Sequence, residues 1–142
     1  MGELSIYFDR QGNPIRDPIT WAKLHASEYK RVAGTTIENV WVSTVWVGLD
    51  MGLRGFYGDD DDAPLIFETM VFVWDRPPWA PVHPELASWD QDCWRYATEA
   101  QAIAGHDRVC IGVRMLLERI RMAEEVLNEA IDRTKGTSGE GA

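Results

Sequence analysis

The side chains best suited to chemistry are a carboxylate and a histidine in apolar surroundings. Glu68 interrupts a run of large apolar residues, and a carboxylate there is costly unless it is paired or lines a pocket. Because histidine titrates near neutral pH, His106 with Glu68 or Asp50 predicts the acid/base pair of a small hydrolase. The structural alternatives are an ion pair from Glu68 to Arg95 or Arg54 across a sheet, and a helix-packing role for His106.

A second group of side chains predicts a binding surface rather than a reaction. Thr44, Trp46 and Asp50 share one face of a predicted strand, and Thr69 directly follows Glu68. An indole with hydroxyl and carboxylate neighbours suits a nucleotide base or ribose, although a tryptophan in a sheet core gives the same pattern. The candidate ligand-binding set is Thr44, Trp46, Asp50, Glu68, Thr69, Arg95, Tyr96 and His106.

Familiar catalytic and metal-binding motifs do not occur in the sequence. There is no Walker A loop, no GxGxxG, no GxSxG and no HExxH. The run Asp59 to Asp62 offers oxygen ligands for Ca²⁺ or Mg²⁺, but it lacks the spacing of an EF-hand loop and such runs are usually solvated. We therefore expect no catalytic residue, no metal and no cofactor, and predict a protein that is not an enzyme.

Composition limits the size of the fold and the class of partner. The 142 residues suit one domain, and 23 acidic against 14 basic residues give a formal net charge of −9. That field repels phosphate backbones and anionic lipids, so we expect neither direct nucleic-acid binding nor membrane binding. Two cysteines far apart, Cys93 and Cys110, with no signal peptide or membrane-spanning stretch, predict a reducing cytoplasm.

The expected fold is α+β, with a central antiparallel sheet built on a long hairpin. Asp17-Pro18 has the form of a helix cap followed by proline, so a short N-terminal helix is expected through Ser27. Val40 to Gly48 and Leu65 to Trp74 are rich in β-forming residues and mostly apolar on both faces, which predicts paired central strands covered on both sides. Cys93 to Ala97 predicts one more short strand.

A long helix is expected to complete a single domain over residues 1–134. Thr98 with Gln101 matches a capping box, and the helix is predicted over about 99–134. The Gly- and Ser-containing stretch 135–142 is predicted to be a disordered tail. The proline-rich segment Arg76 to Asp92 cannot lie inside a sheet and is expected to be an excursion or a flap.

Apolar residues in this helix recur at the spacing of a coiled-coil seam. They are Val109, Val113, Leu116, Ile120, Ala123, Leu127 and Ala130. A helix of this length measures about 50 Å, whereas a compact domain of this size is about 30–40 Å across. Part of the seam would then overhang and need a partner, which predicts a homo-oligomer. The alternative is a helix broken at Gly105 or Gly112 and folded back on itself.

Three segments resemble a family of small, uncharacterised tailed-phage proteins. They are VSTVWVGLD at Val42 to Asp50, PLIFETMVF at Pro64 to Phe72, and RYATEA at Arg95 to Ala100 followed by Gly105-His106. The resemblance covers roughly residues 5–108. Met51 departs from it, because the family usually has histidine at that position.

By analogy of context and size, the resemblance implies a phage accessory protein acting in the host cytoplasm. Small phage proteins of this kind include the sponges that sequester cyclic nucleotide signals of Thoeris and related defences. The first functional hypothesis is accordingly a non-enzymatic protein that binds a nucleotide-like immune signal, of the cyclic nucleotide or cyclic ADP-ribose type. The alternatives are an acidic inhibitor that docks on a host defence protein, and the small hydrolase described above.

Overall fold

The computed structural model describes residues 6–50, 63–74, 89 and 92–138. Its elements are β1 (Tyr7–Phe8), β2 (Pro14–Ile15), α1 (Pro18–His25), the 3₁₀ helix η1 (Glu28–Lys30), β3 (Arg31–Ile37), β4 (Val40–Trp46), β5 (Phe67–Val73), β6 (Cys93–Tyr96) and α3 (Glu99–Ser138). Asp59 to Asp62, Met51 and nearly all of Arg76 to Asp92 lie outside the described residues. What was expected of these segments stays a prediction.

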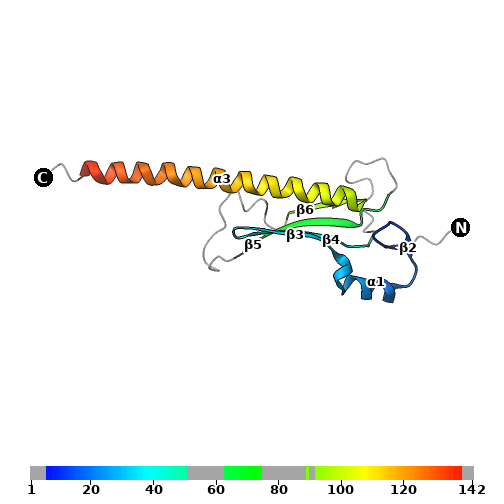
Figure 1. The fold of residues 1–142 in the computed structure, drawn as a ribbon. Coiled ribbons are helices and arrows are strands. Elements are labelled where there is room, and N and C mark those ends of the chain that lie inside the picture. Colours follow the sequence, from blue (N-terminus) through cyan, green and yellow to red (C-terminus); the bar gives the residue numbers. More distant parts are fainter. Residues whose placement is uncertain (1–5, 51–62, 75–88, 90–91, 139–142) are drawn as a thin grey trace.

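The fold is α+β, as the sequence predicts. Four antiparallel strands lie in the order β3-β4-β5-β6, and α3 crosses one face of this sheet (Figure 1). The predicted hairpin is present, because β4 pairs with β5 from Val40↔Val73 to Trp46↔Phe67. The sequence did not separate β3 from β4, and β3 forms an edge of the sheet. The small β1-β2 ribbon and α1 lie at one end of the sheet.

Both predicted helix caps are confirmed. Asp17 accepts hydrogen bonds from the backbone N–H groups of Ile19 and Thr20, with proline at the first helical position. At the start of α3, Gln101 accepts from the N–H of Thr98 while the Thr98 hydroxyl accepts from the N–H of Gln101. These reciprocal bonds satisfy donors that the first helical turn leaves unpaired. The helix runs to Ser138, beyond the predicted end at Thr134.

Among the described residues, α3 covers one face of the sheet, and we call the face away from α3 the uncovered face. The prediction that both faces are covered stays a prediction. Along β4, Val40, Val42, Thr44 and Trp46 are buried beneath α3, whereas Trp41 on the other face is 44% exposed. In the described part of the chain no helix lies across that other face (Figure 1). The apolar character of both faces therefore reflects a core on one side and a partly exposed aromatic surface on the other.

Two apolar clusters hold the elements together. The first joins the middle of α3 to the sheet through Val40, Val42, Val71, Val109, Cys110, Val113 and Leu116. The second, around Trp46 and Phe67, joins the β1-β2 ribbon and α1 to the end of the sheet. In that cluster the indole N–H of Trp21 donates to the carbonyl of Val47 at 3.0 Å.

The two glycines that might have broken α3 instead allow aromatic rings to approach it. A Cβ at Gly105 would lie 2.2 Å from the ring of Tyr96, and one at Gly112 would lie 2.6 Å from the ring of Trp89. The helix is continuous through both positions. Close packing therefore accounts for these residues, rather than a helix break.

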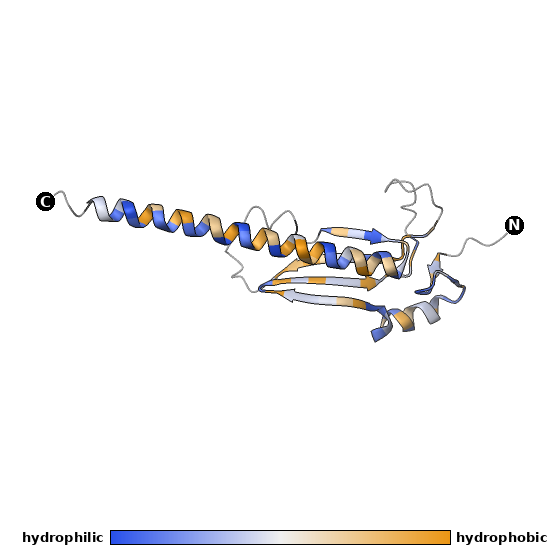
Figure 2. Cartoon of the chain, turned by 45° about the horizontal axis from the view of Figure 1, so that its top comes forward, coloured by the Kyte–Doolittle hydropathy of each residue, from blue (hydrophilic) through white to orange (hydrophobic). Residues whose placement is uncertain are grey.

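The heptad seam is divided between two surroundings. Val109, Val113 and Leu116 are buried in the chain's own core, so within this chain they do not form a free oligomer surface. Ile120 is half-buried, and every residue from 121 to 137 is exposed. The last part of α3 extends beyond the sheet, and hydrophobic residues recur along it between hydrophilic ones (Figure 2). The available part of the predicted interface is Ala123, Leu127 and Ala130.

We predict opposite outcomes for two Gly→Ala substitutions in α3. Gly105→Ala should lower the free energy of unfolding by about 1–3 kcal/mol, because its new methyl group overlaps the ring of Tyr96. Gly136→Ala, which meets nothing within 4 Å, is the matched control and should leave stability unchanged or slightly raised. Urea denaturation of both variants measures the difference. Equal stability of the two variants would contradict the close packing of Tyr96 on α3.

Candidate functional site

Three of the residues predicted to bind a ligand, Thr44, Thr69 and His106, form a buried network under α3 together with Thr35. His106 is 3% exposed, and its Nδ1 lies 2.7 Å from the hydroxyl of Thr44 while its Nε2 lies 2.8 Å from that of Thr35. Thr44 in turn contacts the hydroxyl of Thr69 at 2.6 Å. A neutral imidazole has one donor and one acceptor nitrogen, and hydroxyls can satisfy both. Every ring nitrogen is thus engaged within the protein.

Burial also sets the protonation of this histidine. It lowers the pKa of His106, and the smaller opposing effect of Asp107 does not reverse the shift. The neutral form fits the network, because an imidazolium would need acceptors at both nitrogens inside the core. The geometry corresponds to the helix-packing alternative for His106.

The proposed acid/base pair of Glu68 with His106 does not assemble. Glu68 precedes Thr69 on β5, so its side chain lies on the opposite face of the sheet from the His106 network. There it pairs with Arg95 at 2.6 Å, and both side chains are 13% exposed. The cross-sheet ion pair expected as an alternative is confirmed. The Nη1 atom of Arg95 is buried, and among the described residues it has no hydrogen-bond partner.

The remaining predicted ligand residues are distributed over three further places. Trp46 is fully buried and donates its indole N–H to the carbonyl of Phe8 at 3.0 Å, so it offers no ring face to a ligand. The backbone of Asp50 joins the end of the sheet to the N-terminal ribbon through the carbonyl of Ile6. Tyr96 lies against Gly105 in a small hollow of about 200 Å³. The eight residues therefore do not make one site.

A larger cavity opens on the uncovered face of the sheet, beside its β3 edge. Its volume is about 580 Å³, within the range of small-molecule sites. The lining residues are Lys30, Arg31, Val32, Ala33, Gly34, Thr36, Trp41, Ser43, Thr44 and Val45. It combines two cations, two hydroxyls of the uncovered face and one partly exposed indole, and we call it the β3 cavity.

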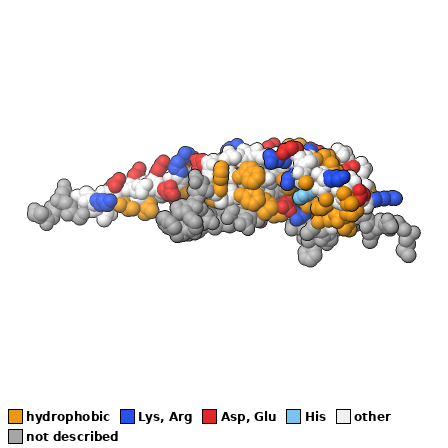
Figure 3. Space-filling model, turned by 90° about the horizontal axis from the view of Figure 1, so that it is seen from below, with side chains coloured by type: hydrophobic (Ala, Val, Ile, Leu, Met, Phe, Trp, Pro, Cys, Tyr) orange, Lys and Arg blue, Asp and Glu red, His pale blue; other side chains and the backbone are white. Residues whose placement is uncertain are grey.

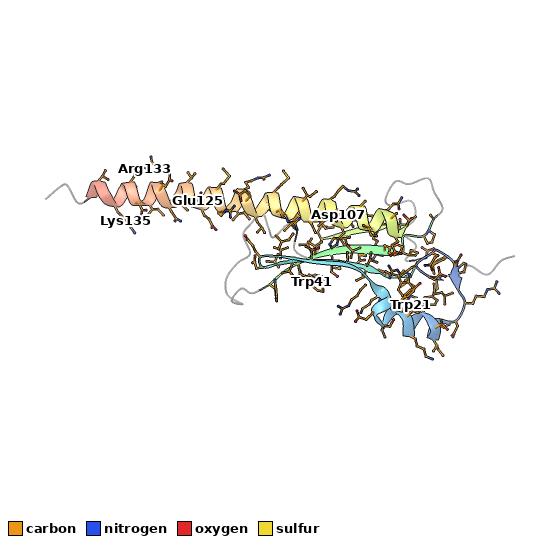
Figure 4. All side chains as sticks on the ribbon, viewed as in Figure 1. Trp21, Trp41, Asp107, Glu125, Arg133 and Lys135 are labelled. Carbon is orange, nitrogen blue, oxygen red and sulfur yellow. The ribbon has the colours of Figure 1, made fainter. Side chains whose placement is uncertain are left out.

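The indole of the β3 cavity is held in place from one side. Trp41 stacks on Phe72 with ring centroids 5.4 Å apart and an interplanar angle of 29°. Gly34 of the neighbouring strand β3 lies next to this indole, because a Cβ at Gly34 would be 3.5 Å from Nε1 of Trp41. Figure 4 shows Trp41 on the side of the sheet away from α3. A positioned, 44% exposed indole is a surface on which a planar ring can stack.

The Arg31 cation of the β3 cavity is only weakly paired within the protein. Arg31 contacts Glu28 at 3.2 Å, but both side chains are more than 70% exposed, and exposed pairs of this kind contribute little. Lys30 precedes it at the end of η1. An anionic group that binds Arg31 would therefore displace only the weak surface ion pair with Glu28. Sequence reasoning missed this cavity because Lys30-Arg31 makes no basic stripe.

An apolar recess adjoins the cavity. Thr36, Trp41, Phe72 and Trp74 line a space of about 270 Å³, and Trp74 is 54% exposed. Hydrophobic side chains gather on this face of the molecule in Figure 3. Cys93 lies on the same face at the far edge, where burial and then the charge of Glu68 raise the pKa of its thiol to about 11.

Other classes of site are not found within the described ranges. Those residues contain no group of three or more His, Cys, Asp or Glu placed to bind a metal ion. None of their helices has the length and apolar character needed to cross a membrane. Comparison of the chain with protein-family models, with curated proteins and with solved structures gave no match.

We predict that stability falls as the pH is lowered through the range in which His106 would titrate. Since its folded pKa is lowered, the unfolded chain binds more protons below about pH 6.5, and the loss reaches at most about 1.4 kcal/mol per pH unit for one histidine. His106→Gln should flatten this slope between pH 7.5 and 5.5. Denaturant unfolding at several pH values measures it.

His25 provides the matched control for the pH experiment. Burial, and secondarily Lys30, lower the pKa of His25, so it contributes a slope of the same sign. His25→Gln should keep the part of the pH dependence of stability that comes from His106. The double variant should lose the parts that come from both histidines. A slope that is unchanged in His106→Gln would contradict the neutral, buried state of this side chain.

Proposed function

We propose that this protein is a non-enzymatic binding protein that captures a small, anionic, planar ligand of nucleotide type in the β3 cavity. The observation that carries the proposal is the cavity's composition: an exposed indole on Phe72, hydroxyls of Thr36 and Ser43, and cations at Lys30 and Arg31. Indoles stack on bases, and guanidinium groups bind phosphate through paired hydrogen bonds. The segments that resemble phage proteins support sequestration of a cyclic nucleotide or cyclic ADP-ribose signal in a host cell as the biological role.

The local charge makes such a ligand compatible with an acidic chain. The formal net charge is −9, yet Lys30 and Arg31 are adjacent at the cavity mouth. A small dianion meets this local pair, whereas a nucleic-acid strand would extend over the surrounding acidic surface. The proposal therefore favours a compact nucleotide over a polymer. Because Glu68 and His106 lie on opposite faces of the sheet, the geometry supports capture without turnover.

The test is a thermal-shift screen against mononucleotides, cyclic dinucleotides, cyclic trinucleotides and cyclic ADP-ribose isomers. A ligand present at 100 times its dissociation constant should add about 2.7 kcal/mol of stability, a shift of several degrees for this chain length. Trp41→Ala and Arg31→Glu should each weaken the apparent affinity for the ligand at least tenfold, which reduces the thermal shift. Mass spectrometry should recover the ligand chemically intact.

Two exposed residues outside the cavity provide controls. Trp74→Ala removes an indole that does not line the β3 cavity, and Arg114→Glu reverses an exposed charge on α3. Both variants should keep the wild-type shift. The proposal fails if no ligand of these classes shifts the melting temperature, or if Trp41→Ala and Arg31→Glu bind as the wild type does.

A second candidate is docking on a host protein through the apolar recess. It is favoured by the adjacent, exposed indoles of Trp41 and Trp74, because tryptophan is enriched among residues that dominate interface energies. In that case Trp74→Ala would abolish capture of the partner while Arg31→Glu would not. The two candidates therefore give opposite patterns in the same set of variants.

A further inference from the structure

The apolar face of α3 continues past the sheet that covers it. Val113 and Leu116 are buried against the sheet, and the same helix face carries Ala123, Leu127 and Ala130 at heptad spacing. Leu127 is 59% exposed and its neighbour Ile131 is 42% exposed. Residues 121–138 form an extension of about 27 Å, called the α3 overhang from here on. We propose that the α3 overhang pairs antiparallel with that of a second copy of this chain.

The position of the sheet selects the antiparallel arrangement. In a parallel pair, each helix would lie along the whole seam of the other, including the part at Val109 and Val113 that the sheet already occupies. A straight, continuous helix could not avoid that sheet. The sheet lies beside the N-terminal part of α3 (Figure 1). In the antiparallel pair the partner therefore fills only the free half of the seam, and its own sheet would lie beyond the end of the first helix.

The side chains of the α3 overhang are complementary to themselves in this arrangement. With the two-fold axis between residues 128 and 129, Leu127 packs on the partner's Ala130. At this central pair a large residue meets a small one, which allows close helix packing. The same register places Glu124 level with the partner's Arg133, which has the opposite charge.

Charge also favours a second copy over other partners. Although the whole chain has a net charge of −9, residues 121–138 contain three basic and four acidic side chains. Two overhangs therefore meet almost without net repulsion, while the acidic remainder of each chain is held at opposite ends. Figure 3 shows hydrophobic side chains along one edge of the overhang and acidic ones along the other.

The size of the contact sets the expected affinity. Two helices paired over this length bury on the order of 1,000 Å² in total, at the small end of specific interfaces. We expect a dissociation constant in the micromolar range, so that monomer and dimer exchange with concentration.

Sedimentation velocity of the full chain between about 1 and 300 µM tests the association. The wild type should shift from monomer to dimer, whereas Leu127→Glu and Ile131→Glu should remain monomeric. Met122→Glu is the matched control, because Met122 is 58% exposed on the opposite side of the helix and should leave the dimer intact. A wild type that stays monomeric, or that is unaffected by Leu127→Glu, overturns the proposal.

Nitroxide labels test the direction of pairing. In Asn128→Cys the two labels should be close across the helix pair, whereas in Arg121→Cys they should be separated by more than about 20 Å along the axis. Equal distances at both positions would show a parallel pair and overturn the antiparallel one. The native thiols should label slowly at pH 7, because Cys110 is buried and the pKa of Cys93 is raised to about 11.

This inference stands apart from the proposed ligand site. The β3 cavity is lined by residues of η1, β3 and β4, and the α3 overhang lies beyond the sheet on the other face. Leu127→Glu should therefore abolish the dimer without changing ligand binding, and Arg31→Glu should do the reverse. If the dimer is not found, the ligand proposal still stands, and if no ligand binds, the dimer proposal still stands.

Discussion

The packing of α3 on one face of the sheet is the interaction on which the rest of the structure depends. Apolar contacts to Val40, Val42 and Val71 supply most of its area, but such contacts alone permit sliding along the helix axis. The hydrogen bonds between His106 and the hydroxyls of Thr35 and Thr44 do not permit this sliding, because they need one relative position of helix and sheet. A shift of one turn would leave the buried imidazole of His106 without its two hydroxyl partners, at a cost of about 1–3 kcal/mol for each lost partner. The network thus fixes the position of the helix.

Features encoded by neighbouring residues were predictable from the sequence. The caps at Asp17 and Thr98 depend on side chains bonding to a backbone two or three positions away, and both were identified correctly. The β4-β5 hairpin followed from two runs of β-forming residues, Val40 to Gly48 and Leu65 to Trp74. The division between β3 and β4 was missed, because Gly34 and its threonine neighbours give β3 a weak apolar pattern. The glycines of α3 gave no local sign of the rings that they accommodate.

The predicted site was harder to obtain, for a physical reason. A polar residue in an apolar strand signals that it has a partner, and it does not say whether the partner is a ligand or the protein itself. Thr44, Thr69 and His106 satisfy one another in the core, and Glu68 satisfies Arg95 across the sheet. The side chains of the β3 cavity gave a weaker signal, because Trp41 and Lys30 are far apart in the sequence and belong to no shared motif. Only the pleat of β4 places Trp41 outside and Thr44 inside.

The heptad seam contains the same ambiguity in another form. Spacing of 3 and 4 residues reports an apolar face on a helix, whether a sheet or a second helix covers it. In α3 the sheet covers the first part of this apolar face, at Val113. Nothing in the described part of the chain covers the second part, at Leu127. Because the helix is continuous through Gly105 and Gly112, the direction of its free face is set by the sheet at its other end. The residues that bury the first half of the seam therefore also determine how a partner can approach the second half.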